Sequence, residues 1–229
     1  MTTRTPLHSV LAAACTFALG ACATDGMGKV DPELETPRYE SLEREGRFEI
    51  RQYAAYVVAE TTVEGEYDEA ARKAFRRLAG YIFGGNSGQN KIAMTAPVAS
   101  ESVREKGQRI AMTAPVESTQ SESAAPGTDI KGQWKTSFMM PSQFTLQDLP
   151  KPNDERVVFA ERPARTMGVI VFNGFVTDAV VAQRLDELKD WLQAGGKRWS
   201  GPYTLARYND PFTLPWNRRN EIHVRLENH

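Results

Sequence analysis

Two stretches of this chain carry the same order of structural signals, and this repeat constrains the fold more than any other feature. Gly65 and Gly174 each end a β-branched segment, and Asp68 and Thr177 follow where a helix N-cap is expected. Both pairs stand 109 residues apart. In each stretch two strand-like segments precede the glycine, and an apolar stripe at helical spacing follows the cap. The repeat predicts two related halves packed as one α+β unit; a common layout reached by chance is the alternative.

The expected elements follow from alternating or β-branched segments, which predict strands, and from apolar residues at steps of three and four, which predict helices. The first half is expected to hold strands at 48–51, 56–63, 91–98, 109–116 and 134–140, with a helix over 68–83. The second half is expected to hold strands at 157–160, 167–172, 203–208 and 221–226, with a helix after Thr177. Residues 118–132, rich in Ser, Glu, Ala and Gly, predict an exposed loop.

The N-terminus predicts an export signal. Residues 1–21 combine an arginine with an apolar segment too short to span a bilayer. Cys22 follows this segment directly, in a context that resembles the bacterial lipoprotein signal, and cleavage near Ala23 without lipidation is the alternative. The polar residues 22–38 predict a flexible tether to a domain over 39–229. The resemblance implies a lipid-anchored protein of the bacterial cell envelope, on the outer membrane and facing the periplasm, that contacts the membrane through its N-terminal lipid only.

Composition narrows the function further. The chain is 41% hydrophobic and 25% charged, as globular domains are, and its formal net charge is -1. We expect no nucleic-acid partner, because such proteins carry a basic footprint. Both cysteines, Cys15 and Cys22, lie at the N-terminus, which excludes a disulfide framework and a cysteine zinc site in the domain. No structural metal is expected.

Three strings of residues together resemble one family. The string Ile-Ala-Met-Thr-Ala-Pro-Val occurs at 92–98 and again at 110–116. Trp-Lys-Thr-Ser-Phe-Met-Met-Pro follows at 134–141, and a Pro- and Arg-containing string runs over 211–222. From about Tyr39 to Leu226 the chain resembles the SOUL heme-binding protein family. The resemblance implies duplicated ββαββ halves that form a distorted antiparallel β-barrel flanked by two helices. It also implies non-covalent binding of heme or another tetrapyrrole in a shallow apolar cleft.

The first helix carries the main candidates for heme contact. Phe75, Ala79 and Phe83 recur at steps of four, beside Arg72 and Arg76. Apolar contact next to guanidinium groups suits a flat ligand with carboxylates. The alternative is a core stripe with a solvated basic face. In the resembled family this helix lines the cleft, and an arginine matching Arg72 is implicated.

The loop before the last strand is the second candidate. Trp216 could stack on a porphyrin, and Arg218 or Arg219 could meet a carboxylate. The alternative is a turn with a packed tryptophan and a solvated arginine pair. Some members of the resembled family carry a lysine near Leu214 that is credited with propionate contact, and a leucine cannot make it.

Axial ligation of heme iron is expected to be weak or absent. His223 is the one candidate histidine of the domain, but it alternates with apolar residues and shares parity with Glu221 and Arg225, which predicts the solvent side. Met94 and Met112 share parity with apolar residues and are expected to fill the core. Three tyrosines stay undetermined as ligands: Tyr53, Tyr67 and Tyr81.

Three functions compete at this stage. The first is a heme or tetrapyrrole carrier, scavenger or buffer on the envelope, and the second is a hydrophobic small-molecule binding or sensing module that uses the same cleft without heme. The third, a hydrolase or tetrapyrrole-modifying enzyme, lacks an evident nucleophile, so we expect no enzyme. The oligomeric state stays open.

Overall fold

The computed structural model describes residues 34–88, 109–120, 132–210 and 212–227, together with residues 28, 30 and 32. The signal over 1–21, Cys22 and the strand expected at 91–98 lie outside this set. Among the described residues, no helix combines the length and apolar character needed to cross a bilayer.

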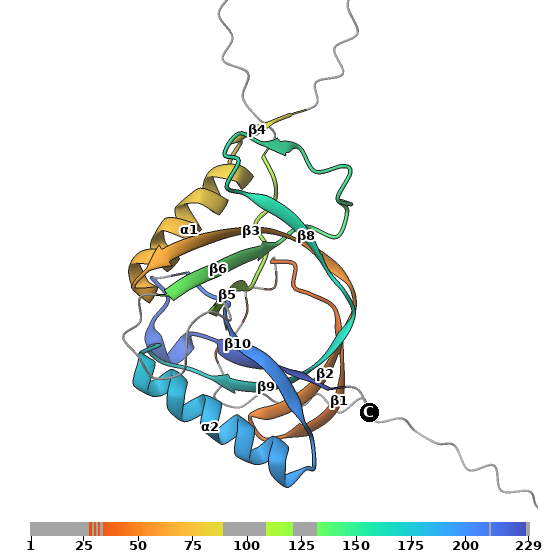
Figure 1. Cartoon of the computed structure of the whole chain (residues 1–229), viewed down its shortest axis with the longest axis vertical. Coiled ribbons are helices and arrows are strands. Elements are labelled where there is room, and N and C mark those ends of the chain that lie inside the picture. Colours follow the sequence, from red (N-terminus) through yellow and green to blue (C-terminus); the bar gives the residue numbers. More distant parts are fainter. Residues whose placement is uncertain are drawn as a thin grey trace, which may run out of the picture.

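A curved antiparallel sheet of nine strands dominates the molecule (Figure 1). Its strand order is β1-β2-β9-β11-β10-β5-β6-β3-β8, and a short β4–β7 pair stands apart. The strands are β1 (Tyr39–Glu45), β2 (Phe48–Tyr53), β3 (Tyr56–Gly65), β4 (Asn86–Ser87), β5 (Val116–Gln120), β6 (Gly132–Met139), β7 (Lys151–Pro152), β8 (Val158–Arg162), β9 (Arg165–Phe172), β10 (Trp199–Arg207) and β11 (Asn220–Leu226).

The strand order confirms the duplication. Without β1, the sheet reads β2-β9-β11-β10 from one edge and β8-β3-β6-β5 from the other. Each strand on one side of the sheet therefore has a counterpart on the other side, and the two sides meet where β5 pairs with β10. The first strands of the two sequence halves are exchanged between the sides, because β2 pairs with β9 and β8 pairs with β3. Gly65 and Gly174, the repeated glycines, both adopt positive φ angles, of 131° and 99°. Glycine adopts this conformation without the strain that a Cβ introduces.

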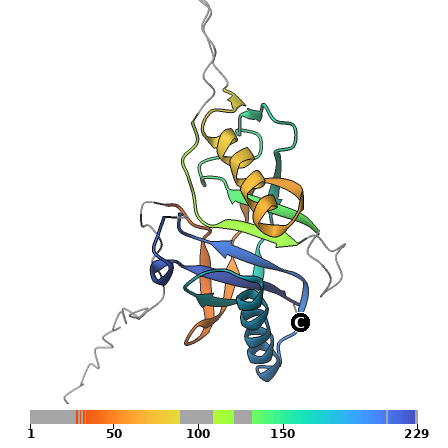
Figure 2. The same cartoon turned by 90° about the vertical axis from the view of Figure 1, so that its left-hand side faces the viewer.

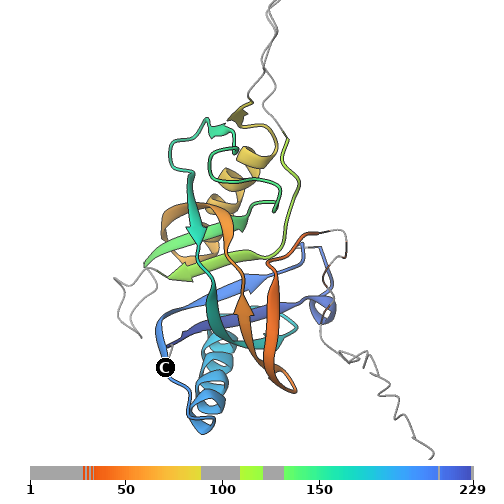
Figure 3. The ribbon, with the colours of Figure 1, turned by 90° about the vertical axis from the view of Figure 1, so that its right-hand side faces the viewer.

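The sheet curls without closing. Its ladder ends at β1 and β8, so the α+β class, the antiparallel sheet and the two helices are confirmed, whereas the barrel stays open. The chain runs almost directly from β2 into β3 and from β8 into β9, and the two bent segments pair along their length (Figure 3). Pairing lapses at Ala54–Ala55 and at Pro163–Ala164, where the proline has no N–H to donate.

The two helices cover the outer face of the curled sheet (Figure 2). Helix α1 (Tyr67–Ile82) buries Ala74, Leu78 and Ile82. Helix α2 (Asp178–Ala194) buries Val181, Leu188 and Leu192. Each helix covers an apolar cluster that its own half supplies in large part, and the cluster under α2 includes Ile50, Ile170, Phe172, Ile222 and Val224.

One helix start and several strands differ from expectation, since β1, β4 and β7 were not predicted. Asp68 lies inside α1, whose N-cap is Glu66 with no side-chain cap bond, so the Asp68 cap was wrong. Thr177 does cap α2, since its side chain accepts a hydrogen bond from Val180 N. The strand expected over 109–116 begins only at Val116, which shows that alternation alone does not secure a ladder partner. Strand β5 therefore occupies the start of the loop expected over 118–132.

Part of the segment expected to be a tether contacts the domain. Val30 and Leu34 pack against a cluster of Ala114, Ala206 and Tyr208. The carboxylate of Glu35 accepts a hydrogen bond from the backbone N–H of Ser142 at 3.1 Å.

Candidate functional site

A cleft of about 780 Å³ lies on the outer face of the sheet, where the two halves meet. This volume lies within the ordinary range of small-molecule sites. Helix α1 forms one wall, the loops before α2 and between β10 and β11 form the other, and strands β5, β6, β10 and β11 supply the floor. Its lining residues are Tyr67, Asp68, Ala71, Arg72, Phe75, Arg76, Val116, Ser118, Thr136, Gly174, Phe175, Val176, Arg207, Asn209, Asp210, Arg218 and Asn220.

The α1 wall places apolar and cationic side chains next to each other. Tyr67, Ala71 and Phe75 stand four residues apart, so they share one face of the helix. The Phe75 ring packs edge-on against Phe138, with 5.4 Å between ring centroids, which leaves its other side to the cleft. Arg72 and its neighbour one turn on, Arg76, flank this face and are exposed. Among the described residues neither of the two donates a hydrogen bond to another side chain.

The opposite wall depends on the turn at Gly174. Its backbone N–H donates to Pro215 O at 2.8 Å, and its carbonyl accepts from Asn220 Nδ2 at 3.2 Å. These bonds join the loop before α2 to the β10–β11 loop. The next residue, Phe175, lines the cleft, and the Arg218 guanidinium lies 5.6 Å from its ring centroid. The wall thereby repeats the combination of an aromatic ring and an arginine seen on α1.

Arg207, on β10 in the floor of the cleft, stands beside Tyr67 at the start of α1. The Arg207 guanidinium stands 5.3 Å from the centroid of the Tyr67 ring. Burial raises the pKa of the Tyr67 phenol, against the opposing effect of Arg207. The phenol therefore stays protonated at neutral pH and can donate a hydrogen bond. The Nε of Arg207 is buried and has no hydrogen-bond partner among the described residues.

The charge of the cleft favours an anionic ligand. Its lining side chains include four arginines against two aspartates, a formal surplus of two positive charges. Asp210 is engaged in its own loop, because its carboxylate accepts hydrogen bonds from the backbone N–H groups of Phe212 and Thr213. These bonds lower the pKa of Asp210.

The structure brings together four of the residues that the sequence nominated for heme contact. These are Arg72, Phe75, Arg76 and Arg218. The other four lie outside the lining. Ala79 is a buried residue of α1, and Phe83 follows the C-terminal end of α1 and lies under Arg109. Trp216 is exposed on the short helix η1 (Pro215–Asn217), and Arg219 donates to Glu221. The prediction extended the four-residue spacing from Phe75 to Ala79 and Phe83, but the cleft-facing part of α1 ends before these two residues.

Sequence reasoning named Tyr67 only as an undetermined iron ligand, and it did not name Phe175 or Arg207. Tyr67 stands eight residues before Phe75 and extends the same helical face, so its position was open to inference. Phe175 and Arg207 belong to the second half and reach the cleft only because β5 pairs with β10. No local pattern in the sequence marks that pairing.

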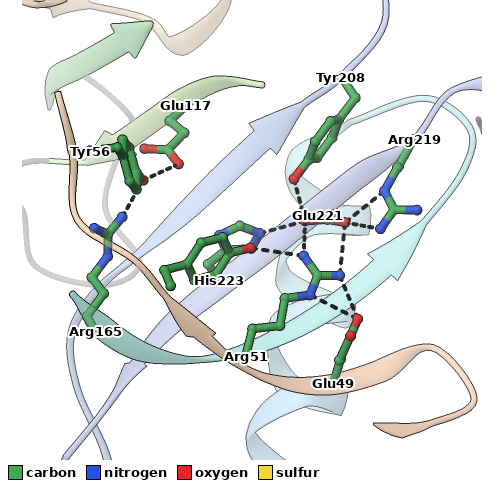
Figure 4. A network of polar contacts seen from close by, with 10 residues as sticks. Glu49, Arg51, Tyr56, Glu117, Arg165, Tyr208, Arg219, Glu221 and His223 are labelled. Carbon is green, nitrogen blue, oxygen red and sulfur yellow. Dashed lines mark hydrogen bonds and ion pairs between the residues drawn. The ribbon is translucent and has the colours of Figure 1, made fainter. Parts of the chain in front are cut away.

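A second group of charged residues lies on the opposite, concave face of the sheet (Figure 4). Arg51 is fully buried there, and its Nη1 donates to Glu221 Oε2 at 2.8 Å. The Arg51 Nε and Nη2 donate to Glu49 Oε2 at 2.9 and 2.8 Å. Arg219 Nε donates to Glu221 Oε1, and the Tyr208 hydroxyl donates to Glu221 Oε2, both at 2.8 Å. We call these five residues with His223 the interior cluster.

His223 belongs to the interior cluster, so its expected solvent position was wrong. Its side chain is buried, and its Nε2 lies 2.8 Å from Glu221 Oε2. In register, Glu49 and His223 flank Val169 on the same face of three adjacent strands. Because the sheet curls, this second face is enclosed instead of solvated. Alternation therefore separated the faces correctly but assigned the wrong environment to one of them.

The interior cluster holds its charges fixed. Burial by itself would raise the pKa of the Glu221 carboxyl. The pKa nevertheless lies well below its usual range, because Arg51, His223 and Arg219 surround the carboxylate. Burial and the Glu221 charge raise the pKa of the Tyr208 hydroxyl well above 10, so it stays a donor. Each charge thus has a partner of opposite sign or a hydrogen bond, as burial requires.

The remaining ligand candidates lie apart from the cleft. Met112 is half-exposed, so its expected core position was wrong, and Met94 lies outside the described residues. Tyr53 is buried beside the interior cluster, where its hydroxyl accepts a hydrogen bond from Arg51. Tyr81 is a buried residue of α1, and its hydroxyl donates to Pro150 O. Tyr67 alone of the three tyrosines lines the cleft.

The fold and the cleft define a class: a duplicated α+β domain with a small-molecule cleft between its halves. Within this class, the chain belongs to the SOUL heme-binding protein family, whose family model matches residues 34–225. It is 30% identical to mouse Heme-binding protein 2 over 201 residues, which are 85% of this chain and 87% of the relative. It is 31% identical to human Heme-binding protein 2, over 82% of this chain and 84% of the relative.

Solved structures with little sequence identity share the fold. The C-terminal domain of EcmrR superposes with a TM-score of 0.57 at 10% identity, covering 83% of this chain and 99% of that domain. A hydrolase from Listeria innocua superposes with a TM-score of 0.52 at 11% identity, covering 81% and 94%. At such identities the likeness concerns architecture alone, since one fold serves many functions.

Proposed function

We propose that this protein binds heme or a related tetrapyrrole non-covalently in the cleft between its two halves. The observation that carries the proposal is the cleft itself, where aromatic rings on both walls stand beside arginines. The names of the relatives, Heme-binding proteins 1 and 2, support the choice of ligand. A tetrapyrrole with two carboxylates matches the formal surplus of two positive charges in the lining.

Each wall of the cleft supplies an aromatic ring for the macrocycle and arginines for its carboxylates. The flat macrocycle packs between Phe75 on α1 and Phe175 on the opposite loop, which removes apolar surface from water. Its carboxylates meet Arg72 and Arg76 at one rim or Arg218 at the other. Leu214 lies outside the lining, so the arginines take the role that the resembled family credits to a lysine near that position.

Binding in this cleft does not depend on iron. None of the described lining residues is a histidine, cysteine or methionine, and His223 is engaged on the other face. The Tyr67 phenol, whose pKa burial raises, is protonated and does not offer the phenolate that iron would take. The affinity then comes from the ring and the carboxylates, so metal-free protoporphyrin binds as tightly as hemin. The same observation favours a second candidate function, binding of other flat hydrophobic anions without heme.

The role is one of binding, and we propose no catalysis. Active sites concentrate groups with strongly shifted pKa values. In this molecule the fully buried, strongly shifted carboxyl of Glu221 faces the concave side and is saturated by Arg51 and Arg219. The cleft carboxylate of Asp210 is committed to its own loop.

The setting is the cell envelope. We propose that Cys22 is lipidated, that it anchors the protein to the outer membrane facing the periplasm, and that the domain serves there as a heme carrier, scavenger or buffer. Mass spectrometry of the membrane-extracted protein tests the anchor. The mature N-terminus should carry the diacylglyceryl mass, and Cys22→Ser should release the protein from the membrane fraction. An unmodified cysteine would contradict the anchor without affecting the cleft.

A paired titration tests ligand binding. Residues 22–229 carrying Cys22→Ser are titrated with hemin and with protoporphyrin, followed by absorbance and tryptophan quenching. We expect both ligands to saturate at one equivalent with affinities within about threefold of each other. An unrelated protein of similar charge controls for hemin adsorption. Linear quenching like that of the control would refute the site, and saturation by hemin alone would refute the iron-independent mode.

A further inference from the structure

The loop between β10 and β11 displays three large apolar side chains to solvent. Phe212 is 92% exposed, Leu214 52% and Trp216 63%. We call these three residues the apolar crest. Scattered exposed apolar residues are ordinary, but three within five positions concentrate apolar surface on one loop, which points to a binding partner.

The loop holds the apolar crest in place through its own hydrogen bonds. Besides the bonds that Asp210 accepts, Arg218 Nε donates to Thr213 O at 2.7 Å, and Asn217 N donates to Leu214 O at 2.9 Å. These bonds hold the loop in shape, and the three apolar side chains of the crest are left exposed. Figure 2 shows the short blue helix η1 of this loop at the side of the molecule.

The apolar crest stands at the rim of the ligand cleft. Asn209 and Asp210 before it and Arg218 after it all line the cleft. Both ends of the loop therefore belong to the cleft wall while its middle faces away. Whatever the apolar crest contacts is brought next to the mouth of the cleft.

The N-terminal segment approaches the same loop. Gly28 is buried, and a Cβ added to it would stand 2.2 Å from the carbonyl carbon of Arg218 and 2.4 Å from Asn217 O. The backbone at Gly28 thus lies directly against the loop. Cys22 precedes Gly28 by six residues, which span at most about 20 Å even when fully extended. A lipid on Cys22 therefore holds this side of the domain near the bilayer.

We propose that the apolar crest docks onto the phospholipid bilayer, so that the cleft opens at the membrane surface and the tetrapyrrole passes between lipid and cleft without crossing bulk water. The proposal rests on the proposed function for the lipid anchor and for the ligand. The crest has the chemistry of an interfacial anchor, since tryptophan and other large apolar side chains settle at the headgroup boundary. Because the crest itself is uncharged, docking needs no anionic lipid.

The test measures docking without heme and without the lipid anchor. The chain over 22–229 with Cys22→Ser is mixed with vesicles of pure phosphatidylcholine, and binding is followed by co-sedimentation and tryptophan emission. Trp216 is far more exposed than the buried Trp134, so its entry into lipid should shift the emission to shorter wavelength. We expect Phe212→Ser/Leu214→Ser to lower the partition coefficient by about tenfold or more.

Leu42→Ser is the matched control, because Leu42 on β1 is 54% exposed, close to the 52% of Leu214. We expect it to leave partitioning unchanged, and circular dichroism confirms that each variant is folded. Absence of wild-type binding to the vesicles, or an equal loss in Leu42→Ser, would overturn the proposal. Hemin titration in lipid-free buffer separates this outcome from failure of the proposed function. The double variant should bind hemin like the wild type, and a lost hemin affinity would make the crest a ligand lid instead of a membrane contact.

Discussion

Arg72 and Arg51 lie on opposite faces of the same sheet and illustrate two uses of one side chain. Arg72 is exposed on α1 at the rim of the cleft, with no hydrogen bond to another side chain among the described residues. Arg51 is fully buried on the concave face and bonds two carboxylates, Glu49 and Glu221. The guanidinium of Arg72 can therefore hydrogen-bond a ligand, whereas the guanidinium of Arg51 is already bonded to side chains of the fold.

The interior cluster therefore contributes to the stability of the fold, and the cleft arginines contribute to ligand binding. Removing a partner from the interior cluster leaves a charge buried without compensation, which costs folding free energy. Removing a cleft arginine leaves the fold untouched and weakens only the attraction for an anion. The two faces should therefore respond independently to mutation, and the variants below test that independence.

The largest effect is expected for Arg51→Met. It leaves the carboxylates of Glu49 and Glu221 buried without their shared guanidinium, which we expect to cost about 3–5 kcal/mol in the free energy of unfolding. Urea denaturation followed by circular dichroism measures the loss, with the exposed Lys73→Met as control. Hemin affinity of the folded fraction should be unchanged. A loss under about 1 kcal/mol would show that the cluster is solvated.

The second effect concerns pH. The folded-state pKa of Glu221 lies well below its value of 4.5 in the unfolded chain, so ionised Glu221 stabilises the fold above about pH 4.5. This contribution is lost as the pH falls from there through the folded pKa. Glu221→Gln should be less stable at neutral pH, yet its unfolding free energy should fall less steeply between about pH 5 and pH 3. Parallel stability curves for wild type and variant would contradict the assignment.

On the cleft side, Arg72→Glu should weaken hemin binding by about tenfold or more, because charge reversal replaces an attraction for a carboxylate with a repulsion. Lys73→Glu makes the same charge change on the neighbouring residue of α1, which does not line the cleft, and should alter the affinity less than about twofold. Both should unfold within about 0.5 kcal/mol of wild type. Equal losses in the two variants would indicate a non-specific electrostatic effect.

The smallest effect is expected for His223→Gln. The glutamine amide can keep a hydrogen bond to Glu221, which limits the loss of stability. We expect the free energy of unfolding to fall by about 1 kcal/mol relative to wild type. The Soret band of the hemin complex should not move, because the imidazole faces away from the cleft. A shifted band would identify His223 as an iron ligand and would place the ligand on the concave face.

The sequence predicted the repeat, the two helices and most strands, because each signal is local. Gly65 and Gly174 require a turn that favours glycine, and Thr177 offers its own oxygen to Val180 N. The start of β5 at Val116 was not predicted, because a strand forms where a partner strand lies beside it, and the local sequence does not identify that partner. The pairing of β5 with β10 depends on both halves together.

The site was predictable on the α1 wall and, on the opposite wall, at Arg218 alone. Four-residue spacing on α1 identified Arg72 and Phe75, which lie on one helix and need no tertiary information. Phe175 and Arg207 reach the cleft through long-range pairing. The environment of His223 could not be read from alternation, because that pattern distinguishes the two faces of a strand and does not show that curling encloses both.

The location of the ligand is the central claim, and backbone amide chemical shifts test it most directly. Metal-free protoporphyrin, which is diamagnetic, is added to the isotope-labelled chain over 22–229 carrying Cys22→Ser. We expect the perturbed amides to gather on Ala71, Phe75, Ser118, Gly174 and Asn209, with those of Arg51, Val169 and His223 unchanged. Perturbations centred on the β2, β9 and β11 residues of the concave face would contradict the account.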